Sequence, residues 1–406
     1  MRSYDVIING GGLVGASLAL ALTEKSFSVA VIETRNPALS KSATPQSDPR
    51  VTALSDVSRR FFQALDLWPR LQNLCGHIEH IHVSDANGAG VCSMHAEHIR
   101  APALGYVIEN FQLLQLLWQQ MEHAGVAIHA PANIDAIDTR TDAVQVRLQD
   151  GRLLRSRLLI ACDGAQSATR KRAGISAHHY DYRQTAVLAT VTAQNPLRGW
   201  AYERFTGDGP MAMLPMQSMD GTMRYALIWC MPTEQANLYM RYDEQRFADQ
   251  LRLRFGRRLG KLRLQGPRYR YPLHFSVAAG TIAPRCLLVG NAAHSLHPVA
   301  GQGFNLSLRE IARIREQLVL TLAAGGDIGS ASSLQTIAVQ YALDTECTAM
   351  ATHYLVLGFS NSLFGVTMLR NLGLLGFDHF PMLKRWLTRQ AMGGRQLPLL
   401  SRGVAV

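Results

Sequence analysis

The sequence predicts an α/β protein that begins with a Rossmann-type dinucleotide-binding domain, carries an inserted, mostly antiparallel sheet and ends in helices. Three observations predict this fold class. A buried strand, a glycine-rich turn and a helix follow one another at the N-terminus, alternating strands rich in aromatic residues and methionine occupy residues 180–272, and helical patterns dominate after residue 303. A strand, a helix and a second strand in this order are typical of a parallel sheet.

The elements follow from local patterns along the chain. Residues 4–9 form an apolar run, 12–24 have helical periodicity and 27–33 form a second apolar run, so we expect a βαβ unit. The same criteria predict helices over 56–67, 110–123 and 244–255, and strands over 126–129, 143–148, 158–161, 186–192, 211–215, 224–230 and 286–290. Gln149-Asp150-Gly151 predicts a hairpin turn.

Composition limits the class of protein. The 406 residues are 47% hydrophobic and 17% charged, which suits two or three packed domains and excludes collagen-like, coiled-coil and disulfide-rich proteins. The six cysteines are scattered without metal-ligand or redox spacing, and no signal peptide is recognisable, so we expect a cytoplasmic protein. The net charge of +11 leaves three alternatives, which are nucleic acid, an anionic membrane surface and a phosphate-bearing cofactor.

A glycine-rich motif follows the first strand and opens the first helix. Gly10-Gly11-Gly12-Leu13-Val14-Gly15 has the form G-x-G-x-x-G, and Glu33 stands 18 residues beyond Gly15. The glycines permit a tight turn and close approach to a pyrophosphate, the helix start offers free N–H groups, and the acidic side chain can bind ribose hydroxyls. This arrangement predicts dinucleotide binding and leaves NAD and FAD open.

Two later motifs indicate FAD. Asp163-Gly164 and Gly290-Asn291-Ala292-Ala293-His294 resemble elements of the class A flavoprotein aromatic hydroxylases, of the para-hydroxybenzoate hydroxylase type. The resemblance implies that Asp163 and Gly164 lie near the dinucleotide and the NADPH approach, and that Gly290 and Asn291 meet the ribityl chain. It also implies cofactor contacts for Arg50, which follows Asp48-Pro49, and for Gln112. The alternative for Arg50 is a surface loop.

The most specific run covers residues 297–305. His297-Pro298-Val299-Ala300-Gly301-Gln302-Gly303-Phe304-Asn305 resembles the signature of the ubiquinone-biosynthesis hydroxylases, a branch of that superfamily. The glycines let the backbone approach the isoalloxazine, the next helix points N–H groups at the flavin, and the proline fixes the loop direction. The residues expected near the flavin are Pro298, Gly301, Gln302, Gly303, Phe304 and Asn305. A plain helix-capping loop is the alternative.

Three residues depart from the family pattern. Asn291 replaces an aspartate, Ser307 a glycine and Glu310 an aspartate. Asparagine can still bond a ribityl hydroxyl, so we expect FAD binding to survive. The Gly-Asn-Ala-Ala sequence at 290–293 resembles the 2-polyprenyl-6-methoxyphenol hydroxylases more than the other hydroxylases of that branch. The same holds for the runs 203–206, 209–216 and 255–261. The resemblance extends over residues 5–310.

The resemblance implies the chemistry. NADPH (or NADH) reduces FAD, O₂ adds to give a flavin C4a-hydroperoxide, and an electron-rich phenol accepts a hydroxyl group. No side chain has to act as a nucleophile, and no catalytic residue can be named from the sequence. The side chains proposed for the substrate wall are Tyr202, Arg204, Met213 and Pro215. Ordinary sheet core is the alternative for the methionines.

The resemblance also implies a domain division. The expected FAD-binding domain consists of residues 1–75, 101–179 and 273–335, and the expected substrate domain of 76–100 and 180–272. Residues 336–406 are expected to form a C-terminal helical region. His294 and His297 form an H-x-x-H pair, but no third ligand and no helical i,i+4 spacing support a metal site, so none is expected.

The positive charge is concentrated in two stretches. Eight basic residues and no acidic one lie between 252 and 270, and six basic residues with only Asp378 follow Cys347. Apolar residues recur at helical spacing at Leu355, Phe359, Leu363, Val366 and Leu369. They predict an amphipathic helix that lies on an anionic membrane surface, covers a polyprenyl tail or packs on the FAD domain. A cytoplasmic protein, peripheral on the inner membrane, is expected.

The leading hypothesis is an FAD-dependent hydroxylase of a polyprenylated phenol, with other ubiquinone-biosynthesis proteins as candidate partners. Within the family, the rivals are a sibling with another ring position and a hydroxylase of a small soluble phenol. From other classes, the rivals are a nucleic-acid-binding flavoprotein and a non-catalytic flavin-binding subunit. Phe255, Tyr269 and Tyr271 accompany the basic stretch, so a nucleic-acid-binding surface stays open as an alternative, but nucleic acid is not an expected partner because the cofactor phosphates and a membrane surface account better for the charge.

Overall fold

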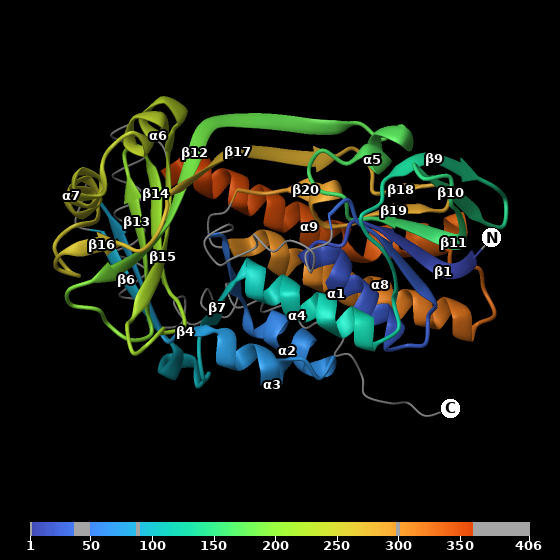
Figure 1. Ribbon diagram of the computed structural model, residues 1–406, viewed down its shortest axis with the longest axis horizontal. Coiled ribbons are helices and arrows are strands. Elements are labelled where there is room, and N and C mark those ends of the chain that lie inside the picture. The colour runs from blue at the N-terminus through green and yellow to red at the C-terminus, as the bar shows by residue number, and fades with distance from the viewer. Residues whose placement is uncertain (1, 36–48, 87–89, 298–300, 360–406) are drawn as a thin grey trace.

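The computed structural model describes residues 2–35, 49–86, 90–297 and 301–359, and it confirms the α/β class with two large sheets (Figure 1). The first sheet has eight strands in the order β18-β19-β11-β1-β2-β8, with β9 and β10 added beside β11. The second has nine strands in the order β20-β17-β12-β15-β14-β13-β5-β6, with β16 paired to β12. A small third sheet consists of β3, β7 and β4.

The N-terminal βαβ unit forms the centre of the first sheet, as predicted. β1 (Arg2–Asn9), α1 (Leu13–Thr23) and β2 (Val29–Ile32) follow one another, and β1 pairs in parallel with both β2 and β11 (Leu153–Ala161). Parallel pairing continues to β19 (Cys286–Leu288) and β8 (Ala127–His129), and the short β18 (Ile282–Ala283) closes the edge. These strands are apolar on both faces because both faces are covered.

Helices cover one face of this sheet. They are α1, α2 (Asp56–Ala64), α4 (Asn110–His123) and α8 (Gln302–Ala323), and α9 (Ala331–Phe359) packs on α8. Val6 and Ile8 of β1 belong to this core, whereas Ile7 points to the opposite face. That face is covered by β9 (Ile134–Thr139) and β10 (Val144–Leu148), which runs antiparallel to β11 through the predicted hairpin turn.

The second sheet is mostly antiparallel, as predicted. Its strands are β5 (His80–Asp85), β6 (Val91–His95), β12 (Ala177–Ala193), β13 (Trp200–Thr206), β14 (Gly209–Pro215), β15 (Arg224–Pro232), β16 (Leu262–Leu264), β17 (Tyr269–Ala278) and β20 (His294–Ser295). Only β13 and β5 pair in parallel. Helices α6 (Thr233–Met240) and α7 (Glu244–Phe255) cover one face, where Trp229 and Phe247 are fully buried. The other face of the second sheet lines a large cavity.

Two long strands connect the two halves of the molecule. Figure 1 shows β12 and β17 running side by side along the top, from the second sheet toward α5 (Ala168–Arg172) and the first sheet. The domain boundaries expected at residues 180 and 272 therefore fall inside continuous strands. They do not mark linkers. The sheet was predicted to begin later than it does, because the first half of β12 is largely polar and the alternation of apolar residues begins only in its second half.

The helix expected over 56–67 is shorter in the structure. α2 ends at Ala64, because Asp66 adopts a left-handed backbone conformation with φ 57°, and the single turn α3 (Trp68–Leu71) follows beyond the expected range. The third sheet, of β3 (Val51–Leu54), β7 (Gly105–Glu109) and β4 (Gly76–Ile78), lies beside these helices. Both features bring the segment around residue 50 close to the start of α8.

The C-terminal expectation is only partly within the described residues. α9 extends to Phe359, and residues 360–369 of the predicted amphipathic pattern lie outside the described ranges. Within those ranges, no helix is both long enough and apolar enough to cross a bilayer.

Candidate active site

A large cavity lies where the first sheet, the start of α8 and the open face of the second sheet meet. Its volume is about 800 Å³, near the upper end for small-molecule sites in proteins. Residues predicted from the cofactor motifs line one part of it, and they are Gly12, Leu13, Val14, Arg50, Gly164, Asn291, Gly301, Gln302, Gly303, Phe304 and Asn305. The second sheet forms the opposite wall.

The glycine turn brings the start of α1 to the cavity. A side chain at Gly15 would place its Cβ 1.8 Å from the carbonyl oxygen of Gly10, and Gly10 itself has φ 106° and lies against Cys162. Both positions therefore require glycine, although neither lines the cavity. No side chain caps α1, so the N–H groups of its first turn remain available to an anion.

Glu33 stands beside this turn, at the end of β2. Its Oε2 accepts a hydrogen bond from the backbone N–H of Gly11 at 2.6 Å, and its Oε1 accepts bonds from Thr34 and Arg35. The carboxylate is thereby held at the edge of the glycine turn rather than in the cavity. A ribose that lies between the glycine turn and the end of β2 would contact this carboxylate.

The second helix start at the cavity belongs to α8. Gly301 precedes it with φ 59°, and no side chain caps its first turn, where Gln302, Gly303 and Phe304 line the cavity. The uncapped N–H groups face a site where negative charge would be stabilised. Pro298, expected in the same loop, lies outside the described residues.

Asn305 ties this helix to β3. Its Oδ1 accepts bonds from the backbone N–H of Ser55 at 2.9 Å and the hydroxyl of Ser58 at 2.6 Å, and its Nδ2 donates to the carbonyls of Ala53 and Gly301, both at 2.8 Å. All four of these bonds are buried or partly buried. Asn305 therefore fixes the relative position of two cavity-lining segments.

Glu310, one of the three departures from the family pattern, holds the turn at 290–294 in place. Glu310 accepts a hydrogen bond from Thr345 at 3.0 Å and bonds His294 Nε2 at 2.7 Å, and its second oxygen is 3.4 Å from the N–H of Gly290. Both Glu310 and His294 are 1% exposed. Asn291, on the same turn, lines the cavity. Glu310 thus positions the turn where the ribityl chain is expected.

Asp163 and Gln112 do not reach the cavity. The carboxylate of Asp163 accepts bonds from Asn9, Ser167 and both the N–H and the hydroxyl of Thr169, so it is saturated by the protein. Gln112 donates to Glu109 instead. Asp163 organises the start of α5, and the expected cofactor contacts of both side chains stay predictions.

The substrate wall was assigned to the wrong face of the second sheet. Tyr202 and Met213 are directly paired across β13 and β14 and point into the core under α6 and α7. Arg204 donates to the carbonyl of Arg254 and to Ser84 on that same side. Successive strand residues alternate between faces, so the cavity is lined instead by their neighbours, which are Ala201, Glu203, Phe205, Pro210, Ala212 and Leu214. Tyr202 is the exception, because it belongs to this core and also lines the cavity, as expected.

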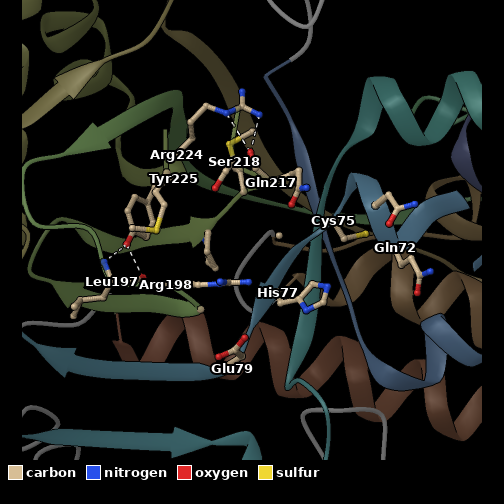
Figure 2. Close-up of a pocket in the computed structure, with 16 residues that line it drawn as sticks. Gln72, Cys75, His77, Glu79, Leu197, Arg198, Gln217, Ser218, Arg224 and Tyr225 are labelled. Carbon is tan, nitrogen blue, oxygen red and sulfur yellow. Dashed lines mark hydrogen bonds between the residues drawn. The ribbon is translucent and has the colours of Figure 1, made fainter. Parts of the chain in front are cut away.

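Pro215 lies in a different pocket. This second pocket has a volume of about 630 Å³ and lies on the other side of β4, where Glu79, Arg198 and Arg224 surround it (Figure 2). Arg224 donates to the carbonyl of Gln217 and lies 3.6 Å from Glu109. Its polar lining separates it in character from the larger cavity.

Glu203 is the site residue that the sequence argument missed. It lies on the cavity face of β13, and burial raises its pKa to about 7. The signal was present, because this carboxylate alternates along the strand with the apolar residues Ala201 and Phe205. His297 also lines the cavity, and burial lowers its pKa to about 4, so its imidazole is neutral at neutral pH.

The residues present fit FAD. Two uncapped helix starts, a glycine turn without room for side chains and a carboxylate at the end of β2 supply the donors and acceptors that a flavin dinucleotide requires. Among the described residues, no three His, Cys, Asp and Glu side chains gather to hold a metal ion.

Comparison with known proteins agrees with this cavity. Residues 3–332 match the family described as "FAD binding domain". The chain is 36% identical to the ubiquinone hydroxylase UbiL of Rhodospirillum rubrum, over 98% of this chain and 93% of the relative. It is 32% identical to the 3-demethoxyubiquinol 3-hydroxylase of Escherichia coli, over 96% and 98%.

A solved structure shares the fold. The p-nitrophenol 4-monooxygenase PnpA of Pseudomonas putida superimposes with a TM-score of 0.78 at 19% identity, over 98% of this chain and all of that chain. Fold and site together define an FAD-dependent aromatic monooxygenase that uses NAD(P)H and O₂. The chain belongs to the FAD-binding-domain family and, within it, to the FAD-dependent hydroxylases of ubiquinone biosynthesis.

Proposed function

We propose that the protein hydroxylates the aromatic ring of a polyprenylated phenol of the 2-polyprenyl-6-methoxyphenol type, with NADPH as reductant and O₂ as oxygen source. The observation that carries this proposal is the apolar wall of the second sheet. Its cavity-facing side chains include Ile81, Val83, Met94, Ala201, Phe205, Ala212, Leu214 and Ile228. Each methylene buried against such a wall contributes about 0.8 kcal/mol, so an isoprenoid chain is a favourable occupant.

The chain's own residues have distinct tasks in this reaction. Bound FAD supplies the oxygen-transfer chemistry. The start of α1 binds the pyrophosphate and the start of α8 stabilises negative charge on the flavin ring. The apolar wall orients the phenol and excludes water from it. Asn305 and Glu310 keep the segments around the flavin in place.

The test is a comparison of two phenols with the FAD-loaded protein. NADPH oxidation and product formation are measured with 2-geranyl-6-methoxyphenol and with 2-methoxyphenol, which lacks the chain. Burial of several methylenes predicts a kcat/KM roughly 100-fold or more higher for the geranyl compound. Equal values would favour a small soluble phenol as the substrate. If neither phenol supports NADPH oxidation, the proposal is contradicted.

Ring position is decided by the product. We expect the geranyl compound to gain one hydroxyl group at a single ring carbon, which NMR of the isolated product identifies. The intermediate that accumulates in a strain lacking this protein provides an independent check. An accumulated precursor that already carries this hydroxyl group would assign the chain to a different ring position.

We also propose that the protein is cytoplasmic and contacts the inner membrane surface through α9. Val339, Leu343, Met350 and Tyr354 lie on one face of this helix and are 45–68% exposed. The opposite face packs on the core through Ile337 and Tyr341. In the sequence, this helix is followed by the basic residues beyond 369. Apolar and basic groups together favour an anionic membrane.

Liposome flotation tests this contact. The intact protein is expected to float with vesicles of phosphatidylglycerol and phosphatidylethanolamine, and the double variant Leu343→Glu, Met350→Glu is expected to remain in the dense fraction. Leu253→Glu, at a 72% exposed leucine on α7, is the matched control and should float like the wild type. Flotation of the double variant to the wild-type extent would contradict the proposal.

A further inference from the structure

We propose that Glu203 is a catalytic residue that binds the ring hydroxyl of the substrate and accepts its proton. This inference rests on the proposed function, because it assumes a phenol in the cavity. It assigns to one side chain the proton transfer for which no candidate emerged from the sequence.

The position of Glu203 on β13 aims it into the cavity. It pairs with Val83 of β5 on one side and with Ala212 of β14 on the other, and Ala212 pairs in turn with Ile228 of β15. Residues paired across neighbouring strands share a face, and all four line the cavity. Glu203 therefore projects from an apolar row toward the space that faces the flavin-binding segments.

No described residue satisfies this carboxyl group. Among the described residues, Glu203 has neither a hydrogen bond nor an ion pair, and the part of its surface that remains exposed belongs to the cavity wall. A charged carboxylate in apolar surroundings is unfavourable unless a partner compensates it. In this cavity the compensating donor has to come from a ligand, and a phenolic O–H is such a donor.

The other titratable groups of the cavity are less suited to the task. Burial raises the pKa of the Cys162 and Cys230 thiols and of the Tyr202 hydroxyl far above their usual ranges, so all three stay protonated. His297, with a pKa of about 4, is a weak base. The pKa of Glu203, raised by burial to about 7, matches the pH at which a general base works best. Glu203 is also the only carboxylate among the described residues that line the cavity.

The proton balance is simple. The phenolic proton moves from the ring oxygen to a carboxylate oxygen of Glu203, which becomes a neutral carboxylic acid, and the oxygen lone pair raises the electron density of the ring. After the ring carbon has received its hydroxyl group, it loses its hydrogen as a proton and the ring regains aromaticity. This proton leaves with the second oxygen atom of O₂, which ends as water, and NADPH supplies the two electrons. The acid form of Glu203 then returns its proton to the ring oxygen, so the residue is unchanged after each cycle.

The first test measures turnover as a function of pH. Wild-type kcat/KM with 2-geranyl-6-methoxyphenol should rise with pH through about 7 and then level off, because this ratio reports the free enzyme and the carboxylate is its active form. Glu203→Gln should lower kcat roughly 100-fold or more, remove this pH dependence and change KM little. Glu203→Asp should keep the pH dependence at reduced kcat. A Glu203→Gln variant with the wild-type kcat and pH profile would overturn the proposal.

A matched control separates this effect from a general loss of a carboxylate. Glu79→Gln makes the same substitution in the second pocket, on the other side of β4 (Figure 2). We expect wild-type kcat and pH profile for this variant. The flavin absorption spectrum of all variants, recorded at saturating FAD, verifies that each binds the cofactor.

Two further measurements do not depend on turnover. The absorbance of 2-geranyl-6-methoxyphenol bound to the FAD-loaded protein should show the red shift of a phenol that donates its O–H to a carboxylate in the wild type at pH 8, and no such shift in Glu203→Gln. The melting temperature of Glu203→Gln should exceed the wild-type value by roughly several degrees at pH 8 and equal it at pH 4, because a raised carboxyl pKa weakens stability only above the unfolded pKa.

These readouts distinguish the two proposals. A wild-type protein that neither binds nor hydroxylates the geranyl phenol would refute the proposed function, and the catalytic role of Glu203 would fall with it. The melting temperatures would then still show whether this carboxyl group is unfavourably buried. The same red shift in both proteins, or identical melting temperatures at pH 8, would refute the inference while leaving the hydroxylase function intact.

Discussion

At the scale of single residues, Asn305 is the most connected side chain of the site. Its amide satisfies two donors and two acceptors that belong to β3, α2 and the loop before α8. A buried polar group that loses its partner destabilises a protein by about 1–3 kcal/mol. Asn305 is therefore a positioning residue, which acts on the flavin through the backbone around it.

We predict that Asn305→Ala lowers the free energy of unfolding by about 2–4 kcal/mol and weakens FAD binding at least tenfold. Urea denaturation of the FAD-free protein and fluorescence titration with FAD measure the two effects. Asn237→Ala removes an amide at an exposed hydrogen bond to Arg270 and is the control, with an expected change below about 0.5 kcal/mol. Equal effects of the two variants would show that Asn305 does not organise the site.

Glu310 shows how a departure from a family pattern can preserve the arrangement. The longer side chain reaches Gly290, His294 and Thr345 from α8. Ser307, another departure, donates its hydroxyl to the carbonyl of Gly303 at 3.0 Å and so turns inward along its own helix. Neither substitution places a new charge in the cavity.

At the scale of elements, local patterns predicted most of the fold. The helices over 110–123 and 244–255, the βαβ unit and the hairpin at 149–151 were predicted because their periodicity and turn residues are local. The end of α2 at Ala64 was missed because it depends on a left-handed conformation at Asp66, which no pattern of apolar residues reveals. The continuity of β12 was missed because its first half is polar and exposed.

The cofactor motifs were easier to place than the substrate wall. Glycines at a turn have a conformational reason to be where they are, so Gly10, Gly15 and Gly301 could be located from the sequence. When both sets of alternate residues on a strand are apolar, the sequence does not indicate which face meets a cavity. Met213 was assigned to the wrong face for this reason, whereas Tyr202 does line the cavity. Only the packing of α6 and α7 determines the face.

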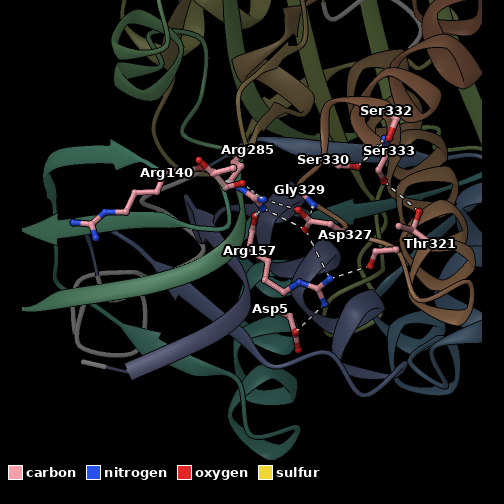
Figure 3. A network of polar contacts seen from close by, with 12 residues as sticks. Asp5, Arg140, Arg157, Arg285, Thr321, Asp327, Gly329, Ser330, Ser332 and Ser333 are labelled. Carbon is pink, nitrogen blue, oxygen red and sulfur yellow. Dashed lines mark hydrogen bonds and ion pairs between the residues drawn. The ribbon is translucent and has the colours of Figure 1, made fainter.

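At the scale of the whole molecule, a polar network fastens the first sheet to the helices (Figure 3). Arg285, 6% exposed, donates to the carbonyls of Thr141 and Arg157 and pairs with Asp327 in the segment between α8 and α9. Burial alone would raise the pKa of Asp327, but the hydrogen bonds from Arg285 and the Gly329 N–H hold this pKa below its usual range. The network joins parts of the chain far apart in sequence.

We predict that Asp327→Asn lowers the free energy of unfolding by about 2 kcal/mol, because Arg285 keeps its carbonyl partners but loses its counter-charge. A lowered carboxyl pKa stabilises the fold above the unfolded pKa of about 3.9 and loses this effect as pH falls through the folded pKa. The difference between variant and wild type should therefore be constant from pH 5 to 8 and shrink below pH 4.

Thermal denaturation across this pH range measures the difference. The control is Asp142→Asn, which breaks a pair with Arg155 at an aspartate that is 70% exposed, and a change below about 0.5 kcal/mol is expected. A difference between Asp327→Asn and the wild type that persists unchanged at pH 3 would contradict the assigned role of the carboxylate.

The basic stretch 252–270 has a partly structural explanation. Arg268 donates to the carbonyls of Tyr239 and Tyr242 and lies 4.7 Å above the ring of Phe247, and Arg254 is 3.3 Å from Asp208. Arg270 bonds Asn237. These arginines hold α6 and α7 on the second sheet, so part of the net charge of +11 serves packing within the protein.

The alternation along β13 and β14 has a consequence for how such a protein can diversify. On each strand, one set of alternate residues holds α6 and α7 in place, and the other set meets the ligand. A substitution at Ala201, Phe205, Ala212 or Leu214 changes what the cavity recognises without touching the packed side. Descendants of one ancestor can therefore acquire new substrates through a handful of exchanges at every second position, while the scaffold and its cofactor cradle are inherited intact.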